Sequence, residues 1–473
     1  MKHISIREIA KDLRDKKYTS VELTKEYLKR IKEKDGEINA FVTVTEEEAL
    51  KAAQDFDNKL AKGEDLPMLA GIPMSLKDLF NTKGIKTTSC SKALENFISP
   101  YDATVVKKLK EYGAVLVGKV NMDEFACGVS TEHSYFGVTK NPLDLERVSG
   151  GSSGGSAASV AADMCLYSLC TDTGGSIRQP AAFCGNYGLK TTYGRISRSG
   201  VNPMASSWDT VGHIANSVED IAIVLEAIAG HDPKDSTTPD VPITDYVGAL
   251  NQGVEGMKIG LPKEYFDEGV KEDVKNAVMK EIERLKALGA EIKEISLPMT
   301  KYAVAVYYIS TPAELSANLE RFDGIRYGHK AAESKDLVES YFNNRGESFG
   351  EEIQRRIMIG TYVLSAGYYD AYYKKAQKAR TLTIQDFNKA FEEVDAIIAP
   401  SVPMRAFKIG ELLNDPLAMY MIDALTIPAN AAGIPSLACP IWKEGETLPY
   451  SMQIMAPQFK EDICLNIASA LEE

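Results

Sequence analysis

The sequence predicts an α/β protein, because short apolar strands alternate with helices along most of the chain. The first strand is predicted at residues 72–76, immediately before Lys77. A helix predicted to begin at Asp102 ends before Gly113, since glycine readily adopts the left-handed conformation that terminates helices. A second strand is predicted at residues 114–117. This strand–helix–strand order is typical of layered α/β folds.

The same alternation continues through the rest of the chain. A helix is predicted over residues 270–288, and residues 300–390 are predicted to be mostly helical and are rich in tyrosine. Further strands are predicted at residues 258–261, 291–295, 394–399, 436–439 and 451–455.

The first sixty residues are predicted to form helices. Thr19 with Glu22, and Thr45 with Glu48, have the spacing of capping boxes, in which each side chain bonds to the backbone N–H of the other residue. Apolar side chains then fall on one face of the first capped helix, at Leu23, Tyr27 and Ile31.

Composition and charge exclude several classes of function. The net charge of −13 and the pI of about 5.2 argue against a broad nucleic-acid-binding face, so a partner is expected to hold most of any RNA. No secretory signal and no long apolar run is evident, and no membrane association is expected. The seven cysteines form no C-x-x-C pair, which predicts reduced thiols and a cytoplasmic location. The five histidines form no H-E-x-x-H motif, so no metal site is expected.

Two glycine-serine turns are the most informative local feature. Residues Ser149–Ser156 read S-G-G-S-S-G-G-S and precede an alanine-rich helix at 157–162, and Asp172–Arg178 follows the strand-like run 164–170. A flexible linker would not be enclosed by regular elements in this way, and a phosphate-binding loop would carry a lysine after its glycines. Hydroxyls beside free backbone N–H groups suit attack on a carbonyl and stabilisation of the resulting oxyanion.

Three residues are the candidates for that chemistry. Ser176 ends the Thr173–Gly175 turn and is the candidate nucleophile; its alternative role is a simple helix N-cap. Lys77 follows an apolar strand, where burial would leave its amine neutral and able to accept a proton; its alternative role is a surface charge. Ser152, placed between them, would relay the proton.

The order of Lys77 and these two turns resembles the amidase signature family. The resemblance extends over most of the chain, through the motifs Leu69–Pro73, Leu94–Phe97, Tyr101–Val106, Asn121–Ala126 and Tyr193–Ser197. It implies a central mixed β-sheet covered by helices on both faces. It also implies one domain over residues 1–473, with N-terminal helices (1–65), a catalytic core (66–230) and a mostly helical cover on the substrate side (300–390).

Within the family, Arg321–Gly328 and Ser365–Tyr373 resemble the branch of glutamine-hydrolysing A subunits of tRNA-dependent amidotransferases. The resemblance implies hydrolysis of glutamine to glutamate and ammonia, with no cofactor in this subunit. The ammonia would pass to a partner B subunit, which uses ATP and Mg²⁺ to amidate Glu-tRNA(Gln) or Asp-tRNA(Asn). A small C subunit would complete a heterotrimer.

The resemblance also implies a role for each site residue. Ser176 would be the acylated nucleophile, Ser152 the bridging serine on a cis peptide bond, and Lys77 the base. Backbone N–H groups of Thr173, Gly174, Gly175 and Ser176 would form the oxyanion hole.

Substrate recognition falls, by the same resemblance, to three residues outside the turns. Arg356 would bind the α-carboxylate of glutamine, with Arg355 as its rival. Asp423 would meet the α-amino group, although it could equally be an ordinary helix carboxylate. Tyr307 would contact the substrate, with Tyr308 as its alternative.

The sequence departs from the family pattern in several places. Leu79 stands where asparagine is usual, two residues from the proposed base; the other departures are Leu143, Thr191 and Pro449–Met452. They leave open a stand-alone amidase with another amide substrate. A non-catalytic scaffold is disfavoured because Lys77, Ser152 and Ser176 are all present.

Overall fold

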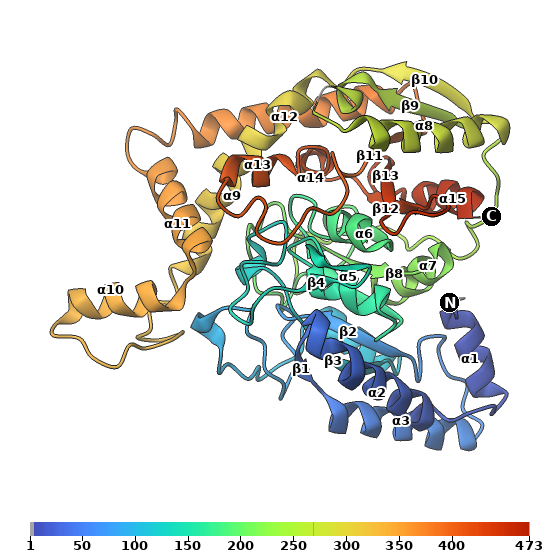
Figure 1. Cartoon of the computed structure of the whole chain (residues 1–473), viewed down its shortest axis with the longest axis horizontal. Helices are drawn as coiled ribbons and strands as arrows, with labels where there is room; N and C mark the ends of the chain where they lie inside the picture. Colours follow the sequence, from blue (N-terminus) through green and yellow to red (C-terminus); the bar gives the residue numbers. More distant parts are fainter. Residues whose placement is uncertain (1–3, 268, 473) are drawn as a thin grey trace.

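The computed structural model describes residues 4–267 and 269–472. Its centre is one mixed sheet of 11 strands (Figure 1). From one edge to the other the strands are β1 (Phe41–Val44), β3 (Val115–Val120), β2 (Pro73–Lys77), β6 (Tyr167–Asp172), β8 (Thr210–Ala215), β7 (Tyr187–Lys190), β12 (Ser436–Ile441), β13 (Tyr450–Met455), β11 (Ala396–Pro400), β9 (Lys258–Pro262) and β10 (Glu291–Ile295). The predicted α/β class with a central mixed sheet is confirmed.

Parallel pairs lie toward the two sides of the sheet, and antiparallel pairs occupy its centre. The edge strand β1 is an exception, because it pairs antiparallel with β3. The strands β3, β2 and β6 run parallel to one another, as do β11, β9 and β10. Parallel neighbours need crossover connections, and two of these contain α4 (Thr104–Glu111), between β2 and β3, and α8 (Glu272–Ala287), between β9 and β10. The strands from β6 through β8, β7, β12 and β13 to β11 pair antiparallel.

Helices cover both faces of this sheet. Consecutive residues of a strand point to opposite faces. Accordingly, Leu169 and Leu437 belong to one hydrophobic core, whereas their neighbours Cys170 and Ala438 belong to another. The helices on the Cys170 face include α5 (Gly154–Ala161) and α6 (Arg178–Cys184); those on the Leu169 face include α7 (Val218–Ile228) and α15 (Glu461–Glu472).

The remaining elements are the N-terminal helices, the helices between β10 and β12, and several short elements. The N-terminal helices are α1 (Ile6–Arg14), α2 (Ser20–Ile38) and α3 (Glu46–Ala61), and the later helices are α9 (Ala303–Leu319), α10 (Leu337–Ser348), α11 (Glu351–Leu364), α12 (Tyr373–Ala390), α13 (Pro416–Met421) and α14 (Ile427–Ala432). Short elements are η1 (Lys92–Leu94), η2 (Glu124–Ala126), η3 (Lys263–Phe266), η4 (Pro298–Tyr302) and the paired β4 (Lys140–Asn141) and β5 (Asp144–Val148). Figure 1 shows α10 extending away from the body of the molecule.

Helices α9 and α11 approach each other very closely. A Cβ atom at Gly360 of α11 would lie 1.9 Å from the carbonyl oxygen of Pro312 in α9. No side chain fits there, so glycine is required for this packing.

Three local predictions fail. Residues 41–44, predicted to be helical with the rest of the first sixty, form the strand β1 because they pair with β3. The other two predictions fail because distant partners replace the expected ones. Thr19 forms its capping box, but Thr45 caps nothing with its side chain and instead donates its hydroxyl to the Leu116 carbonyl at 2.7 Å. The helix predicted to begin at Asp102 begins at Thr104. The Asp102 carboxylate accepts from the Lys83 backbone N–H and from Lys110, both outside the first turn of that helix.

The seven cysteines are all buried and unpaired. In the part of the chain that the structure describes, no helix combines the length and the apolar character that a bilayer span requires.

A buried ion pair ties four elements together at the centre of the sheet. Arg178, at the start of α6, donates from Nε and Nη2 to the two carboxylate oxygens of Asp172 at the end of β6, at 3.0 and 3.1 Å. Its remaining donors reach Asn430 and the Thr426 carbonyl near α14, and Gln453 in β13. Burial opposes ionisation of Asp172, but Arg178 and the neighbouring donors lower its pKa to about 2.

Replacing Arg178 by methionine is therefore expected to destabilise the fold strongly. The change leaves the Asp172 carboxylate buried without its partner, which typically costs about 3–5 kcal/mol. Urea unfolding followed by circular dichroism measures the loss. The control is Lys29→Met, which breaks an exposed ion pair with Glu33 and should cost less than about 1 kcal/mol. Equal losses in the two variants would contradict this account of the ion pair.

Candidate active site

Lys77 is the last residue of β2, and its side chain is completely buried beside the first glycine-serine turn. Its Nζ donates to the hydroxyls of Ser152 and Ser153, both at 2.8 Å, and to the Thr171 hydroxyl at 3.3 Å. The predicted contact between Lys77 and Ser152 is present. The alternative of a surface charge at Lys77 is wrong.

The surroundings of Lys77 favour the neutral amine. Burial lowers the pKa of Lys77 from its ordinary value to about 8. Among the described residues, no carboxylate lies within ion-pair distance of its Nζ, although more distant acidic groups oppose the shift. A lysine with this pKa is partly unprotonated near neutral pH and can accept a proton.

Ser152 lies in a rigid segment just before α5. The Gly151–Ser152 peptide bond is cis. The Gly151 N–H donates to Oε1 of Gln179 at 2.8 Å, and the Ser152 carbonyl accepts from the Asp123 N–H at 3.1 Å. Gln179 belongs to α6, immediately after the second turn, so its side chain joins the two turns to each other.

Ser176 lies in the second turn, between β6 and α6. Its side chain is almost buried, and its hydroxyl forms no hydrogen bond within residues 4–267 and 269–472, neither to Ser152 nor to the helix. The N-cap of α6 is Ile177, which makes no side-chain cap, so the N-cap alternative for Ser176 is wrong. The Asp172 carboxylate instead accepts the Ile177 N–H at 3.1 Å and closes the turn.

The turn itself presents unused backbone donors. Within the described chain, the N–H groups of Gly174, Gly175 and Ser176 have no hydrogen-bond acceptor. Gly175 has a φ of 148°, and a Cβ there would lie 2.2 Å from the Thr426 hydroxyl, so only glycine fits. The Thr426 hydroxyl donates to the Gly174 carbonyl at 2.7 Å. Free N–H groups in a fixed turn can stabilise an oxyanion.

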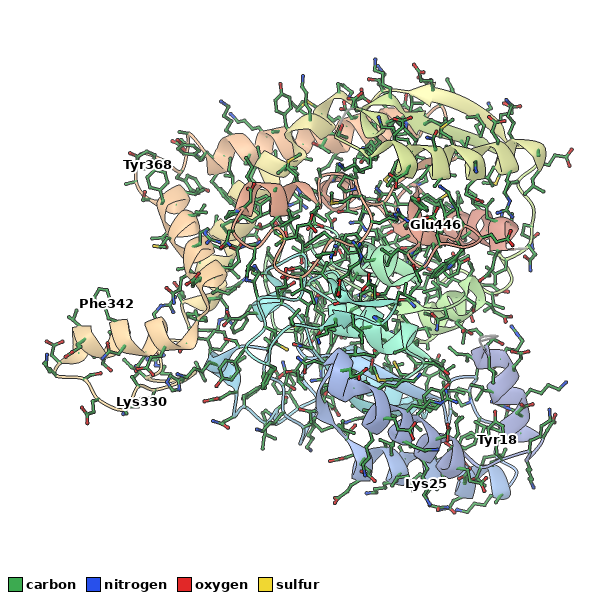
Figure 2. All side chains as sticks on the ribbon, viewed as in Figure 1. Tyr18, Lys25, Lys330, Phe342, Tyr368 and Glu446 are labelled. Atoms are coloured by element: carbon green, nitrogen blue, oxygen red, sulfur yellow. The ribbon has the colours of Figure 1, made fainter. Side chains whose placement is uncertain are left out.

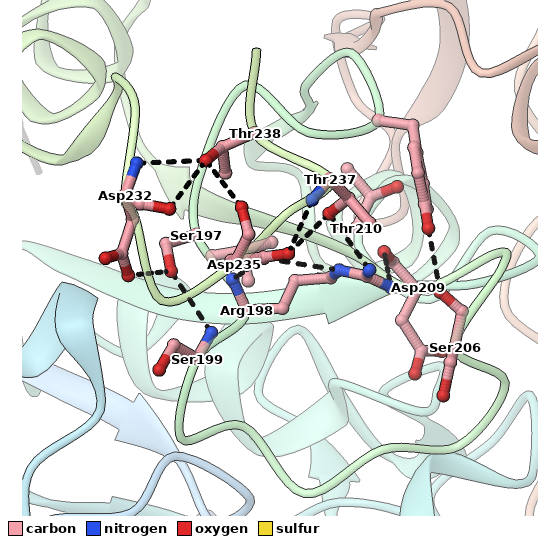
Figure 3. Close-up of polar contacts among 12 residues, drawn as sticks. Ser197, Arg198, Ser199, Ser206, Asp209, Thr210, Asp232, Asp235, Thr237 and Thr238 are labelled. Carbon is pink, nitrogen blue, oxygen red and sulfur yellow. Dashed lines mark hydrogen bonds and ion pairs between the residues drawn. The ribbon is translucent and has the colours of Figure 1, made fainter. Parts of the chain in front are cut away.

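A network of hydrogen bonds around Asp209 holds Thr173, the residue that precedes these glycines, in place. The Thr173 hydroxyl donates to the Asp209 carboxylate at 2.8 Å, and that carboxylate also accepts the Met204 N–H at 2.9 Å. Figure 3 shows the adjoining contacts, in which Arg198 donates from its backbone N–H to Asp235 at 2.7 Å and from its guanidinium to Thr237 at 3.0 Å.

Asp423 faces the same turn with an unsatisfied oxygen. A Cβ at Gly175 would lie 3.0 Å from Oδ1 of Asp423. That oxygen is buried and has no hydrogen-bond partner within the described chain. Burial raises the pKa of Asp423 well above its ordinary value. An unpartnered carboxylate at this place suits a cationic group of a ligand.

Arg356, rather than Arg355, lies inside the site. Arg356 is buried on the inner face of α11, and its Nε donates to Glu352 at 2.7 Å. Its guanidinium lies over the rings of Tyr308 and Tyr420, at 5.3 and 5.6 Å from their centroids. The Arg355 side chain is 41% exposed and pairs with the same Glu352.

Tyr307 contacts the turn, and Tyr308 supports Arg356. A Cβ at Gly174 would lie 2.8 Å from Cζ of Tyr307, whereas the Tyr308 ring stacks on Tyr420 with centroids 3.8 Å apart. Trp208 packs edge-on against Tyr307 at 5.5 Å. Tyr307 of α9 and Asp423, which lies between α13 and α14, therefore face the second turn, and Arg356 of α11 lies over Tyr308, the residue after Tyr307.

Gln179, Asp209 and Thr426 are site residues that sequence reasoning missed. Gln179 directly follows the predicted Asp172–Arg178 turn, but nothing in its spacing from Gly151 indicates that they bond. As for metals, no three histidine, cysteine, aspartate or glutamate side chains lie close enough to hold an ion, in the residues that the structure describes.

Comparisons with known proteins point to one family. A family model described as amidase matches residues 22–465. The A subunit of the glutamyl-tRNA(Gln) amidotransferase of Carboxydothermus hydrogenoformans is 53% identical over 471 residues, which cover 100% of this chain and 97% of the relative. The crystal structure of the corresponding A subunit from Thermotoga maritima has a TM-score of 0.81 at 40% identity, covering 99% of this chain and 94% of that one. The native peptide amidase of Stenotrophomonas maltophilia has a TM-score of 0.85 at 29% identity, covering 100% and 96%.

The reactivity of Ser176 is expected to depend on the protonation of Lys77. Neutral Lys77 accepts a proton, so the rate of Ser176 sulfonylation by phenylmethylsulfonyl fluoride should rise as the pH passes through about 8 and then level off. Mass spectrometry of the labelled protein measures this rate. Lys77→Met should react slowly and without this pH dependence. The same rising profile in both proteins would rule out Lys77 as the base.

Proposed function

Since this chain belongs to the amidase family, we propose that it is the glutamine-hydrolysing subunit of a tRNA-dependent amidotransferase. The observation that carries the proposal is the buried Lys77 in contact with Ser152, together with a second turn in which the N–H groups of Gly174, Gly175 and Ser176 have no acceptor among the described residues. The 53% identity to an amidotransferase A subunit over the whole chain supports the choice of branch.

The groups around the turn complement free glutamine. The unpartnered oxygen of Asp423 suits the α-amino group, and the guanidinium of Arg356 suits the α-carboxylate. Arg356 uses only its Nε on Glu352, so its two terminal amino groups form no hydrogen bond within the described residues. The Tyr307 ring packs against Gly174 and would border the bound substrate on that side. The side-chain amide of the substrate then lies against Ser176.

The proposed reaction has two steps and passes through an acyl-enzyme. Neutral Lys77 takes a proton from the Ser152 hydroxyl, and Ser152 takes the proton of the Ser176 hydroxyl. At the same time Oγ of Ser176 bonds to the amide carbon. The oxyanion is held by the N–H groups of the turn from Thr173 to Ser176. The proton passes to the leaving nitrogen, and ammonia departs. Water then attacks the ester by the same relay and releases glutamate.

The ammonia is proposed to serve a partner B subunit, with a C subunit completing the heterotrimer. The B subunit would use ATP and Mg²⁺ to activate the carboxylate of Glu-tRNA(Gln), or of Asp-tRNA(Asn), and would hold most of the tRNA. The net charge of −13 supports this division of labour. This chain needs no cofactor for its own step, and its seven unpaired thiols suit the cytoplasm.

A stand-alone amidase is the second candidate. Leu79 favours it, because a buried leucine here replaces the asparagine usual in the family, two residues from Lys77. The structural similarity to a peptide amidase also supports it. Such an enzyme would hydrolyse another amide without partners and would not need Asp423 or Arg356.

Substitutions in the relay are expected to act as one unit. Ser176→Ala should abolish ammonia release from glutamine, and Lys77→Ala should lower kcat by about 10³-fold or more. The double variant should be little worse than either single variant, because both remove the same proton-transfer device. A coupled glutamate dehydrogenase assay measures the rates. Independent, multiplying losses, or no ammonia from glutamine even in the assembled complex, would refute the proposal.

Asp423 is expected to determine recognition of the α-amino group. Asp423→Ala should raise KM for glutamine by about tenfold or more, equivalent to about 1.4 kcal/mol, with a smaller effect on kcat. Glu444→Ala removes an exposed carboxylate and is the matched control, with unchanged KM expected. If Asp423→Ala keeps the wild-type KM, and an amide lacking an α-amino group is hydrolysed equally well, the stand-alone amidase is the better assignment.

A further inference from the structure

Helix α11 has one face in the active site and the other in solvent. Its inner face carries Arg356, together with the buried Glu352, Ile353, Gly360 and Val363. These positions recur every three or four residues, as one face of a helix requires. On the outer face, Met358 is 66% exposed and Tyr362 is 48% exposed. A molecule bound to the outer face would therefore lie one helix diameter from Arg356.

The exposed apolar surface of the protein is concentrated around this helix. Nearly half of the exposed large hydrophobic side chains among the described residues fall between residues 325 and 382. On α10, the Phe342 side chain is 75% exposed, and those of Leu337 and Val338 are 66% and 65% exposed. Figure 2 shows Phe342 and Tyr368 pointing outward at the same end of the molecule. A concentration of exposed apolar side chains of this kind is typical of an interaction site.

Tyrosines form an exposed cluster where α11 meets α12. The ring of Tyr368 lies 4.2 Å from that of Tyr362 and 6.1 Å from that of Tyr372, between ring centroids. All three side chains are more than one third exposed. Tyrosine offers a large, rigid contact area with a polar tip, and it is enriched in protein–protein interfaces.

A cleft between α10 and α11 adjoins these side chains. It has a volume of about 1130 Å³, and its apolar lining includes Tyr341, Ile357 and Leu364. Its charged lining is Arg321, Arg326 and Arg345 together with Glu320 and Asp323. A second groove of about 790 Å³ shares Arg321 and Arg326 and adds Lys92, Lys330 and Glu95. Cationic side chains outnumber carboxylates over the cleft and the groove taken together, and Arg321, Arg326 and Lys330 form no ion pair within the described part of the chain. The surface therefore favours a partner that presents apolar side chains accompanied by carboxylates.

We propose that the outer faces of α10 and α11, with the cleft between them, are the docking surface for the ammonia-accepting partner subunit, and that docking positions Arg356 for glutamine. This inference rests on the proposed function. It names the surface through which the partner is held and through which it activates glutamine hydrolysis.

The connections of α11 provide a route for this coupling. Gly360 packs without clearance on Pro312, so a shift of α11 is transmitted to α9. At the other end of α11, the Gly350 N–H donates to Glu124 at 2.9 Å. The neighbouring Asp123 bonds to the Ser152 carbonyl. A partner that fixes α11 thus constrains both the carboxylate-binding arginine and the segment that carries Ser152.

Other occupants fit this surface less well. A second copy of the chain would bring the same unpaired arginines against each other. Asp336 and Glu339 flank the exposed Leu337 and Val338, and carboxylates there oppose contact with anionic lipid. An RNA strand would need continuous cationic surface, whereas α10 presents apolar side chains.

The test uses two charge-introducing variants, Phe342→Glu and Met358→Glu. Each should weaken binding of purified partner B and C subunits by about tenfold or more. The reason is that docking would bury the new carboxylate at a place where the wild-type side chain makes apolar contacts. Each should also abolish the decrease in KM for glutamine that the partner causes. Glutamine hydrolysis without the partner, and the melting temperature, should stay at wild-type values. Met279→Glu places the same charge on the exposed side of α8, far from α10 in Figure 1, and should bind normally.

Each other outcome has a defined meaning. If the wild-type protein neither binds the partner nor releases ammonia from glutamine, the proposed function itself fails. If the wild type binds and both variants bind equally well, the docking surface is wrong and the function stands. Wild-type self-association, vesicle binding or RNA binding that the variants lose would overturn the choice of occupant. Tyr362→Ser, which removes a ring without adding charge, replaces any variant whose melting temperature falls, and it should lose affinity likewise.

Discussion

The buried ion pair between Asp172 and Arg178 is the constraint on which the site depends. Asp172 ends a strand and Arg178 begins a helix, so their contact forces the five residues between them into a tight turn. The same carboxylate accepts the Ile177 N–H, and the same guanidinium reaches β13 and the region of α14. Because these partners satisfy the charges, the N–H groups of Gly174, Gly175 and Ser176 have no acceptor among the residues that the structure describes. A structural ion pair thereby leaves the donors free for a ligand.

Lys77 shows the opposite use of burial. Lys119, on the neighbouring strand, is equally buried but lies 3.1 Å from Asp78 and serves as a paired structural cation. Among the residues that the structure describes, Lys77 has only hydroxyls within bonding distance, so burial lowers its pKa without a compensating ion pair. The two lysines on adjacent parallel strands thus differ in whether they form an ion pair, because the Asp78 carboxylate contacts Lys119 and not Lys77.

The residues in the two turns could be predicted because their function depends on local sequence. Glycine and serine spacing indicates a turn with free N–H groups, and strand periodicity places Lys77 at a strand end. Gln179 and Asp209 could not be predicted, since each acts on a residue about 30 positions away through a contact that only the tertiary fold creates. The predicted roles of Thr45 and Asp102 in starting helices were wrong for the same reason, because each bonds to a residue that is distant in the sequence. The choice of Arg356 over Arg355 could have come from the sequence, because Ile353, Gly360 and Val363 share its helical face.

The sheet order has a consequence for synthesis of the chain. The central pairing of β7 with β12 joins Lys190 to Ser436, so the two halves of the sheet meet through segments far apart in the sequence. A nascent chain that has left the ribosome only as far as β8 presents β7 as an uncovered edge, and open edges invite pairing with other chains. The strands β12 and β13, and Asp423, which faces the second turn, emerge late in synthesis. Ser176 therefore acquires its complete surroundings only when translation of nearly the whole polypeptide is finished.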